Sequence, residues 1–295
     1  MIFLRIFFVL LIAGPIVLGI INYLQNKVHA KPEKTGQLNA LINSAVLYAI
    51  AYNVMFFLQE LFLVLGKKAL GLTAYLYHNN HDWVGSHPMT SLMQGSGALA
   101  IFVIGLAFCL LLRFIRSSKS IWKLLVIWLA FHGLVQSVPQ VMIAAFDQNT
   151  DVGQALGVYL AFGPTLLGVL GALSIVAMVL ICISFSRPLL ELASSEAGID
   201  NPKSRLRFLR NIAALAAFTA CILVIPFRVP PMTQMIGPFI LLLFSIPWTW
   251  SIAGRIENVE PTANDINERI RWEPILVLVA LLLVFRLVLA PGIEF

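Results

Sequence analysis

Charged side chains are scarce in this chain of 295 residues. Asp, Glu, Lys and Arg make up 12% of it, about half the share found in an ordinary water-soluble domain. Apolar residues make up 59%, and they gather in long runs between the charges. This composition excludes a water-soluble enzyme and predicts an all-α, polytopic membrane protein whose residues 1–295 form a single transmembrane helical domain.

Cysteines and familiar catalytic motifs are also few. The three cysteines lie inside apolar runs without metal or redox spacing, which excludes a disulfide scaffold. The sequence has no Gly-x-Ser-x-Gly nucleophile motif and no internal repeat of the two-half transporter kind. Its longest polar stretches, near residues 184–211 and 254–274, are too short for a separate core. We expect them to be interfacial loops, with an interfacial helix over Thr262–Trp272.

Long apolar runs are what the sequence has in abundance. A helix needs about 20 apolar residues to cross the hydrocarbon, and eight stretches meet or approach that length. The fifth is interrupted at Gly163–Pro164, and prolines join the short sixth and seventh, which are either two spans or one disturbed hairpin. The stretches are Ile6–Leu24, Leu41–Leu65, Leu92–Leu112, Ile121–Ala145, Leu156–Ile183, Ile212–Ile225, Ile236–Ile252 and Ile275–Ala290.

The basic residues predict the orientation. The net charge of +6 would suit a nucleic-acid partner, but fifteen of the twenty lysines and arginines fall after the first, third, fifth and seventh segments. The positive-inside rule makes these loops cytoplasmic, so both termini are expected outside. We therefore expect no nucleic-acid partner and a multi-pass protein of a bacterial-type inner membrane, with the lipid bilayer as its surroundings. The first segment also resembles a signal peptide, but its apolar run is longer than usual, which favours retention.

Polar residues inside apolar segments are costly and therefore indicate function. Glu60 in the second segment is the strongest candidate, either as a base or proton carrier or as a carboxylate neutralised by Arg286. In the fourth segment His132, Gln136 and Gln140 are spaced by four and form one polar stripe. Hydrogen bonding between helices is the favoured role of that stripe.

The loop between the second and third segments concentrates histidine. His78, His81 and His87 fall within ten residues, with Asp82 among them. His-x-x-His with a carboxylate is a suitable zinc set. The favoured alternative is that the polar loop residues cap helices and hydrogen-bond the headgroup region, with Asn79-Asn80 forming a simple turn. Two further positions on the same predicted side are Gln94 and Asp147.

The order of these features resembles the site-2 protease family of intramembrane zinc metalloproteases. Gln59-Glu60-Leu61-Phe62-Leu63 stands where that family has His-Glu-x-x-His, so Glu60 matches the general base and both histidine ligands are missing. Thr150-Asp151-Val152-Gly153 resembles the later Asp-Gly motif, with Val152 inserted. The resemblance covers at most Leu41–Ser184. It implies either a non-catalytic relative or a hydrolase in which other histidines bind zinc.

These observations favour a metal-dependent, protease-like membrane hydrolase with an outward-facing site. Glu60 would be its base, and His78, His81 and Asp151 would bind zinc and act on a membrane-embedded or outer-side substrate. Asp151 is equally well explained as a helix N-cap. The alternatives are a transporter or proton-coupled permease that uses Glu60, His132 and Arg286, and a non-catalytic membrane subunit or receptor. The supporting residues in the hydrolase hypothesis are Asp82, His87, Gln94, His132, Gln136, Asp147 and Arg286.

Overall fold

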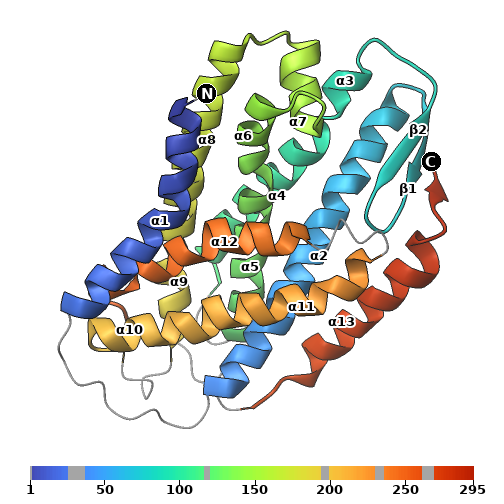
Figure 1. Ribbon diagram of the computed structural model, residues 1–295. Helices are drawn as coiled ribbons and strands as arrows, with labels where there is room; N and C mark the ends of the chain where they lie inside the picture. Colours follow the sequence, from blue (N-terminus) through green and yellow to red (C-terminus); the bar gives the residue numbers. More distant parts are fainter. Residues whose placement is uncertain (1, 26–36, 116–119, 194–198, 230–235, 261–268) are drawn as a thin grey trace.

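The computed structural model describes residues 2–25, 37–115, 120–193, 199–229, 236–260 and 269–295 (Figure 1). The long helices are α1 (Ile2–Gln25), α2 (Gln37–Ala69), α4 (Ser96–Leu112), α5 (Ser120–Ser137), α8 (Pro164–Ser184), α11 (Ala216–Arg228), α12 (Ile236–Ser251) and α13 (Trp272–Val284). Shorter helices and turns are α3 (Thr90–Met93), α6 (Pro139–Phe146), α7 (Asp151–Gly153), η1 (Gln154–Tyr159), α9 (Ser186–Leu190), α10 (Pro202–Leu209), η3 (Arg210–Leu215), η5 (Ala253–Arg255) and η6 (Phe285–Leu289). The strands are β1 (Thr73–Leu76), β2 (His81–Val84) and β3 (Ile293–Glu294).

Seven helical stretches are long and apolar enough to cross a membrane. They correspond to the second to eighth predicted segments, so the prediction of a helical, multi-pass membrane fold is confirmed at that level. The first predicted segment forms α1, in which Val9–Asn22 is an apolar helical stretch. The sixth and seventh segments lie in two helical stretches, Pro202–Arg228 and Ile236–Arg255, each long and apolar enough to cross a membrane.

The fifth predicted segment begins later than its apolar run suggests. Pro164 stands in the first turn of α8, and Gly163 before it is extended, with φ −66° and ψ 160°. Proline suits a helix start and disfavours helical geometry in the residue before it. Gln154–Tyr159 therefore forms a separate π-helical turn. The predicted interfacial helix over Thr262–Trp272 lies largely outside the described residues, and residues 269–271 are not helical.

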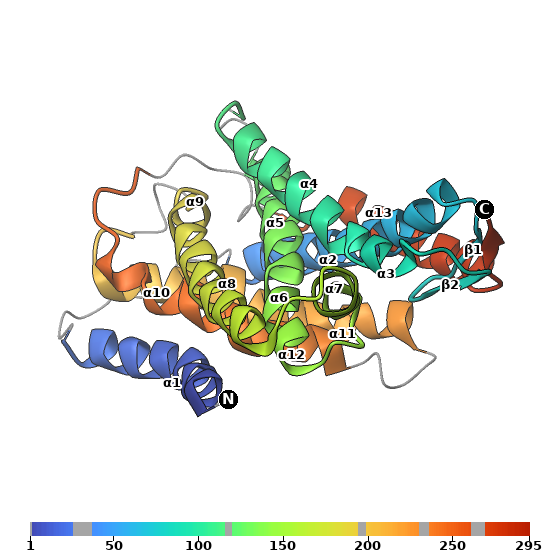
Figure 2. The ribbon, with the colours of Figure 1, turned by 90° about the horizontal axis from the view of Figure 1, so that it is seen from above.

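Helix α2 lies at the centre of the bundle. All eight residues 45–52 are buried, and α2 packs against α4, α5, α11 and α13. A helical stretch whose residues are buried on every side is surrounded by other helices. Figure 2 shows α1 at the periphery, where it packs against α12 and α8.

Helices α4 and α5 approach closely where glycines face each other. A Cβ atom at Gly133 would lie 2.6 Å from the Cα of Gly105, and one at Gly105 would lie 2.9 Å from the backbone nitrogen of Leu134. No side chain fits between the two backbones at this crossing. Gly105 and Gly133 therefore permit close helix packing.

The all-α prediction missed a small sheet. Strand β1 pairs antiparallel with β2 and with β3, in the order β2-β1-β3. The loop between β1 and β2 turns between Tyr77 and Asn80, and the Tyr77 N–H donates to the carbonyl of Asn80 at 2.9 Å. The central residues of this turn are thus His78 and Asn79, so the turn is present but one residue earlier than the expected Asn79-Asn80 turn. We call this end of the bundle the hairpin end, and the end where α2 and α13 begin the opposite end (Figure 1).

Candidate functional site

The hairpin brings His81 onto the carboxylate of α2. Glu60 is 6% exposed, and its Oε2 lies 2.7 Å from Nδ1 of His81. The His81 side chain is 9% exposed. An ionised carboxylate only accepts hydrogen bonds, so Nδ1 donates to Glu60.

Two further side chains determine what the other nitrogen of His81 does. The Lys67 ammonium donates to Oε1 of Gln94 at 3.0 Å and to the Thr90 carbonyl at 3.2 Å. Because an ammonium has no acceptor, the Gln94 atom that faces it must be the amide oxygen. The Nε2 of His81 faces that same oxygen at 3.2 Å. Both ring nitrogens therefore face acceptors, and an imidazolium satisfies both contacts. We call Glu60, His81, Gln94 and Lys67 the hairpin-end network.

Lys67 is the member of the network that the sequence did not single out. In the sequence, Lys67 and Lys68 follow the second apolar segment, at a helix end where a lysine normally reaches solvent. In the structure Lys67 is 0% exposed, and its ammonium lies 4.8 Å from the centre of the Trp83 ring. Trp83 also stacks on His81, with 5.9 Å between ring centres. Its only sequence signal was its place in the last turn of an otherwise apolar helix.

Asp151 acts on the network through its charge. Burial lowers the pKa of His81, but the hydrogen bond and charge of Glu60, together with Asp151 and Gln94, outweigh it, and the net shift is upward. Burial raises the pKa of Asp151, Glu60 adds to that, and His81 and Lys67 oppose it. The expected N-cap role falls to the preceding residue, because the Thr150 hydroxyl accepts from the Gly153 N–H at 3.3 Å.

His78 belongs to a different set of contacts. Its Nε2 lies 3.5 Å from a guanidinium nitrogen of Arg286. Arg286 also donates to the carbonyl of Pro226. Glu60 pairs with His81, whereas Arg286 contacts His78 and Pro226. The suggestion that Arg286 neutralises Glu60 is therefore wrong.

The predicted zinc ligands do not come together as a set. His78 and His81 face different partners, and both nitrogens of His81 face acceptors rather than a common point. Within the described ranges, no group of three or more His, Cys, Asp or Glu is placed to hold a metal ion. The residues present do not fit a zinc site, and zinc stays a sequence-based prediction that these contacts do not support.

The remaining polar residues of the hairpin-end loops make local bonds. Asp82 is exposed and accepts from the Trp83 N–H at 2.8 Å. His87 Nδ1 accepts from the Met89 N–H at 3.2 Å. Asp147 accepts from the Asn149 N–H at 2.9 Å. Each of these side chains shapes a turn at the surface, as the alternative interpretation of the histidine-rich loop expected.

Below the network, polar side chains of α2 face the predicted stripe of the fourth segment. Gln140 donates to the Gln59 side chain at 2.9 Å, and Gln136 donates to the Tyr52 carbonyl at 3.3 Å. Farther along, the Trp128 indole N–H donates to the Ser44 hydroxyl at 3.1 Å. The expected interhelical hydrogen bonds are confirmed for the two glutamines. We call this set the polar seam: Ser44, Tyr48, Tyr52 and Gln59 with Trp128, His132, Gln136 and Gln140.

His132 occupies the middle of the seam and differs from its neighbours. It is 0% exposed, and its ring lies 4.2 Å from the Tyr48 ring and 5.4 Å from the Tyr52 ring, both edge-on. Within the described part of the chain, the two ring nitrogens of His132 have no hydrogen-bond partner, and the hydroxyl of Tyr48 has none either. The prediction of interhelical hydrogen bonding is wrong for this histidine, because aromatic rings surround it.

No protein-family model, curated protein or solved structure matches this chain. The resemblance to site-2 proteases therefore rests on its short motifs alone, and the functional argument depends on the contacts described above.

Proposed function

We propose that this chain is a proton-coupled membrane transporter, in which the hairpin-end network binds the proton and the polar seam conducts it. The observation that carries the proposal is the placement of His81 between two acceptors, Glu60 and Gln94. A histidine held in this way binds a proton that it can release when either contact breaks. Intramembrane chains of Glu, Asp and His are typical proton relays.

The network and Asp151 together have a balanced set of charges. When His81 carries its proton, it and Lys67 supply two positive charges beside the carboxylates of Glu60 and Asp151. Loss of the proton would leave one negative charge in excess in a region that is largely buried. Such an imbalance is costly in a low-dielectric setting. Protonation and the arrangement of the network are therefore coupled, as transport driven by protons requires.

The seam supplies a route away from the network. Gln59 neighbours Glu60 in α2, and the seam runs from there to Ser44. Fifteen helical residues cover about 22 Å, a large part of a hydrocarbon core about 30 Å thick. Polar atoms thus accompany α2 through most of the apolar layer.

The seam is interrupted at Tyr48 and His132, whose polar atoms lack partners within the described residues. A continuous open chain of hydrogen bonds would leak protons. An interruption closed by aromatic rings, and bridged when a ring turns or water enters, slows this leak without abolishing it. A slow proton flux driven by the membrane potential therefore remains when no transported solute is present. On this proposal His132 is the gate of the route.

Proton flux in vesicles tests this function. The full chain is reconstituted with a trapped pH-sensitive dye, and a potassium gradient with valinomycin imposes a membrane potential. We expect dye acidification well above that of empty vesicles. Wild-type flux equal to that of empty vesicles, at every potential and pH, would overturn the proposal.

Two variants and one control assign the flux to the site. Glu60→Gln removes the acceptor charge, and we expect it to reduce flux to the level of empty vesicles. His132→Phe keeps the aromatic packing and serves as a second test if Glu60→Gln does not fold. Glu191→Gln is the matched control, since Glu191 pairs with Lys123 at 3.0 Å outside the network and the seam.

A further inference from the structure

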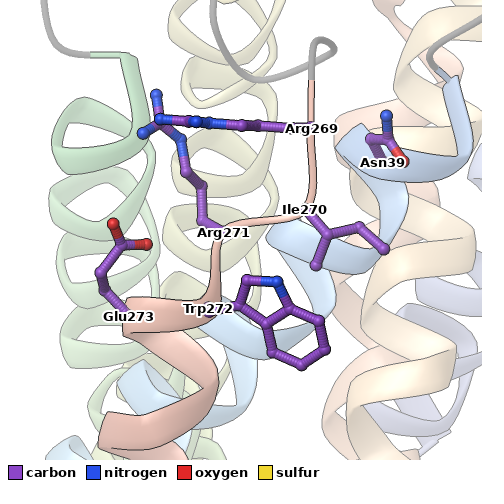
Figure 3. A pocket seen from close by; sticks show the side chains of 6 residues that line it. All are labelled: Asn39, Arg269, Ile270, Arg271, Trp272 and Glu273. Atoms are coloured by element: carbon purple, nitrogen blue, oxygen red, sulfur yellow. The ribbon is translucent and has the colours of Figure 1, made fainter.

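A pocket of about 580 Å³ lies at the opposite end of the bundle (Figure 3). It is formed where α13 begins beside the first turns of α2. Two of its lining residues are arginines and one is a carboxylate, so its lining carries a net positive charge. The lining residues are Asn39, Arg269, Ile270, Arg271, Trp272 and Glu273.

The backbone that carries the arginines is held by a buried side chain of α2. Asn43, 2% exposed, donates from its amide nitrogen to the Arg269 carbonyl at 2.9 Å. Its amide oxygen accepts from the Arg271 N–H, also at 2.9 Å. Both arginines are therefore presented from a fixed segment.

The start of α13 adds to the positive potential of the pocket. Arg271 is the N-cap residue and makes no side-chain capping bond, and Trp272 and Glu273 of the first turn line the pocket. Backbone N–H groups at a helix start favour an anion, and the helix dipole acts in the same sense. In Figure 3 the guanidinium groups of Arg269 and Arg271 lie on the same side, and the Trp272 ring points away from them.

Trp272 indicates the depth at which the pocket lies. Its side chain is 68% exposed at the first residue of an apolar stretch able to cross a membrane. Exposed tryptophan at the end of a span is typical of the headgroup level of the bilayer. Guanidinium groups at that depth match phosphate, which they bind through paired N–H donors.

We propose that this pocket binds a phosphate group through Arg269, Arg271 and the start of α13. The headgroup of an anionic phospholipid and a soluble phosphate compound share this chemistry. The site does not depend on proton transport, and it lies at the other end of α2 from the hairpin-end network.

Native mass spectrometry of the full chain in detergent tests the site, with phosphatidylglycerol, phosphatidylcholine and inorganic phosphate as probes. We expect wild-type protein to retain phosphatidylglycerol at least 10-fold better than phosphatidylcholine. Arg269→Gln and Arg271→Gln should each reduce that preference several-fold, and the double variant should abolish it. Arg269→Lys and Arg271→Lys keep the charge and should retain part of it.

Arg187→Gln is the matched control, because Arg187 is an exposed arginine of α9 outside this pocket. Phosphatidylglycerol binding that inorganic phosphate displaces identifies the phosphate group alone as the ligand. Binding that inorganic phosphate does not displace identifies a lipid headgroup. Equal lipid preference in the wild type, the double variant and the control would overturn the proposal. Thermal unfolding with inorganic phosphate covers the case in which the wild type prefers neither lipid. If inorganic phosphate then does not raise the unfolding temperature, the proposal is overturned as well.

Discussion

Two buried histidines of this protein have opposite surroundings. His81 faces an oxygen acceptor with each ring nitrogen, whereas His132 faces the edges and faces of tyrosine rings and has no hydrogen-bond partner among the described residues. His81 is held by charges, and His132 is held by shape. A buried histidine can thus be held by two acceptors at one position and by aromatic packing alone at another. On the proposed function, the first stores a proton and the second blocks its passage.

Removing the paired histidine should have the largest effect on stability. His81→Phe leaves Glu60 buried without its partner, and we expect a loss of about 3–5 kcal/mol in the free energy of unfolding. Thermal or denaturant unfolding in detergent measures it. Asp82→Asn changes the adjacent, exposed residue and should stay within about 0.5 kcal/mol of wild type. An unaltered unfolding curve for His81→Phe would contradict the ion pair.

Removing the shared acceptor comes next. Gln94→Leu keeps the size of the side chain but deprives two charged donors, Lys67 and His81, of one oxygen. We expect a loss of about 1.5–3 kcal/mol, because hydrogen bonds to charged groups are worth that much. Gln154→Leu, at a half-buried glutamine whose bond to the Asn149 carbonyl is 3.4 Å long, is the comparison. Similar losses of unfolding free energy in both variants would mean that the bonds from Lys67 and His81 to Gln94 add no extra stability.

The unpaired histidine should respond with the opposite sign. His132→Phe replaces two buried, unpartnered nitrogens by carbon, and we expect a gain of about 1–2 kcal/mol in unfolding free energy. The same variant should lose proton flux in vesicles. Trp128→Phe, which breaks the bond to Ser44, should instead lower stability. A loss of stability in His132→Phe would contradict this expectation and indicate that His132 has a hydrogen-bond partner in the folded protein.

The smallest effect is the dependence of stability on pH. The pKa of His81 is raised in the folded protein, so its contribution is complete below the unfolded value of about 6.5 and is lost as pH rises through the folded pKa. Wild-type stability should therefore fall above pH 6.5 relative to His81→Gln. Asp151 has a raised pKa as well, and His81 opposes that rise. Subtracting the His81→Gln curve therefore removes only the part of the Asp151 contribution that does not depend on His81. Parallel curves for the two proteins would mean that His81 binds no extra proton.

Sequence alone predicted the helices well, because spans of apolar residues are long and local. The three-stranded sheet escaped it, since β1 and β2 have four residues each and β3 has two. Strands so short are defined by pairing with distant partners such as Glu294 opposite Tyr75. The pattern of neighbouring residues in the sequence does not predict such long-range pairing.

The candidate site was predicted in part. Glu60 and His81 stood out because a carboxylate in an apolar run and a histidine-rich loop are unusual. Their direct contact, and the separation of His78 from His81, depend on how the hairpin folds back over α2. Lys67 was missed because a lysine at a helix end normally reaches solvent.

The glycine crossing of α4 and α5 has a mechanical consequence. With no side chain between the backbones of Gly105 and Gly133, this crossing would be the fulcrum if α4 swung relative to α5. Gln94 lies eleven residues along the same apolar stretch, a lever arm of roughly 16 Å, so a swing of about 5° would displace it by about 1.4 Å. His132 adjoins the fulcrum and would hardly move. On the proposed function, a slight swing of α4 would therefore lengthen the 3.2 Å contact between His81 and Gln94 and favour proton release, while the ring contacts of His132 stayed in place.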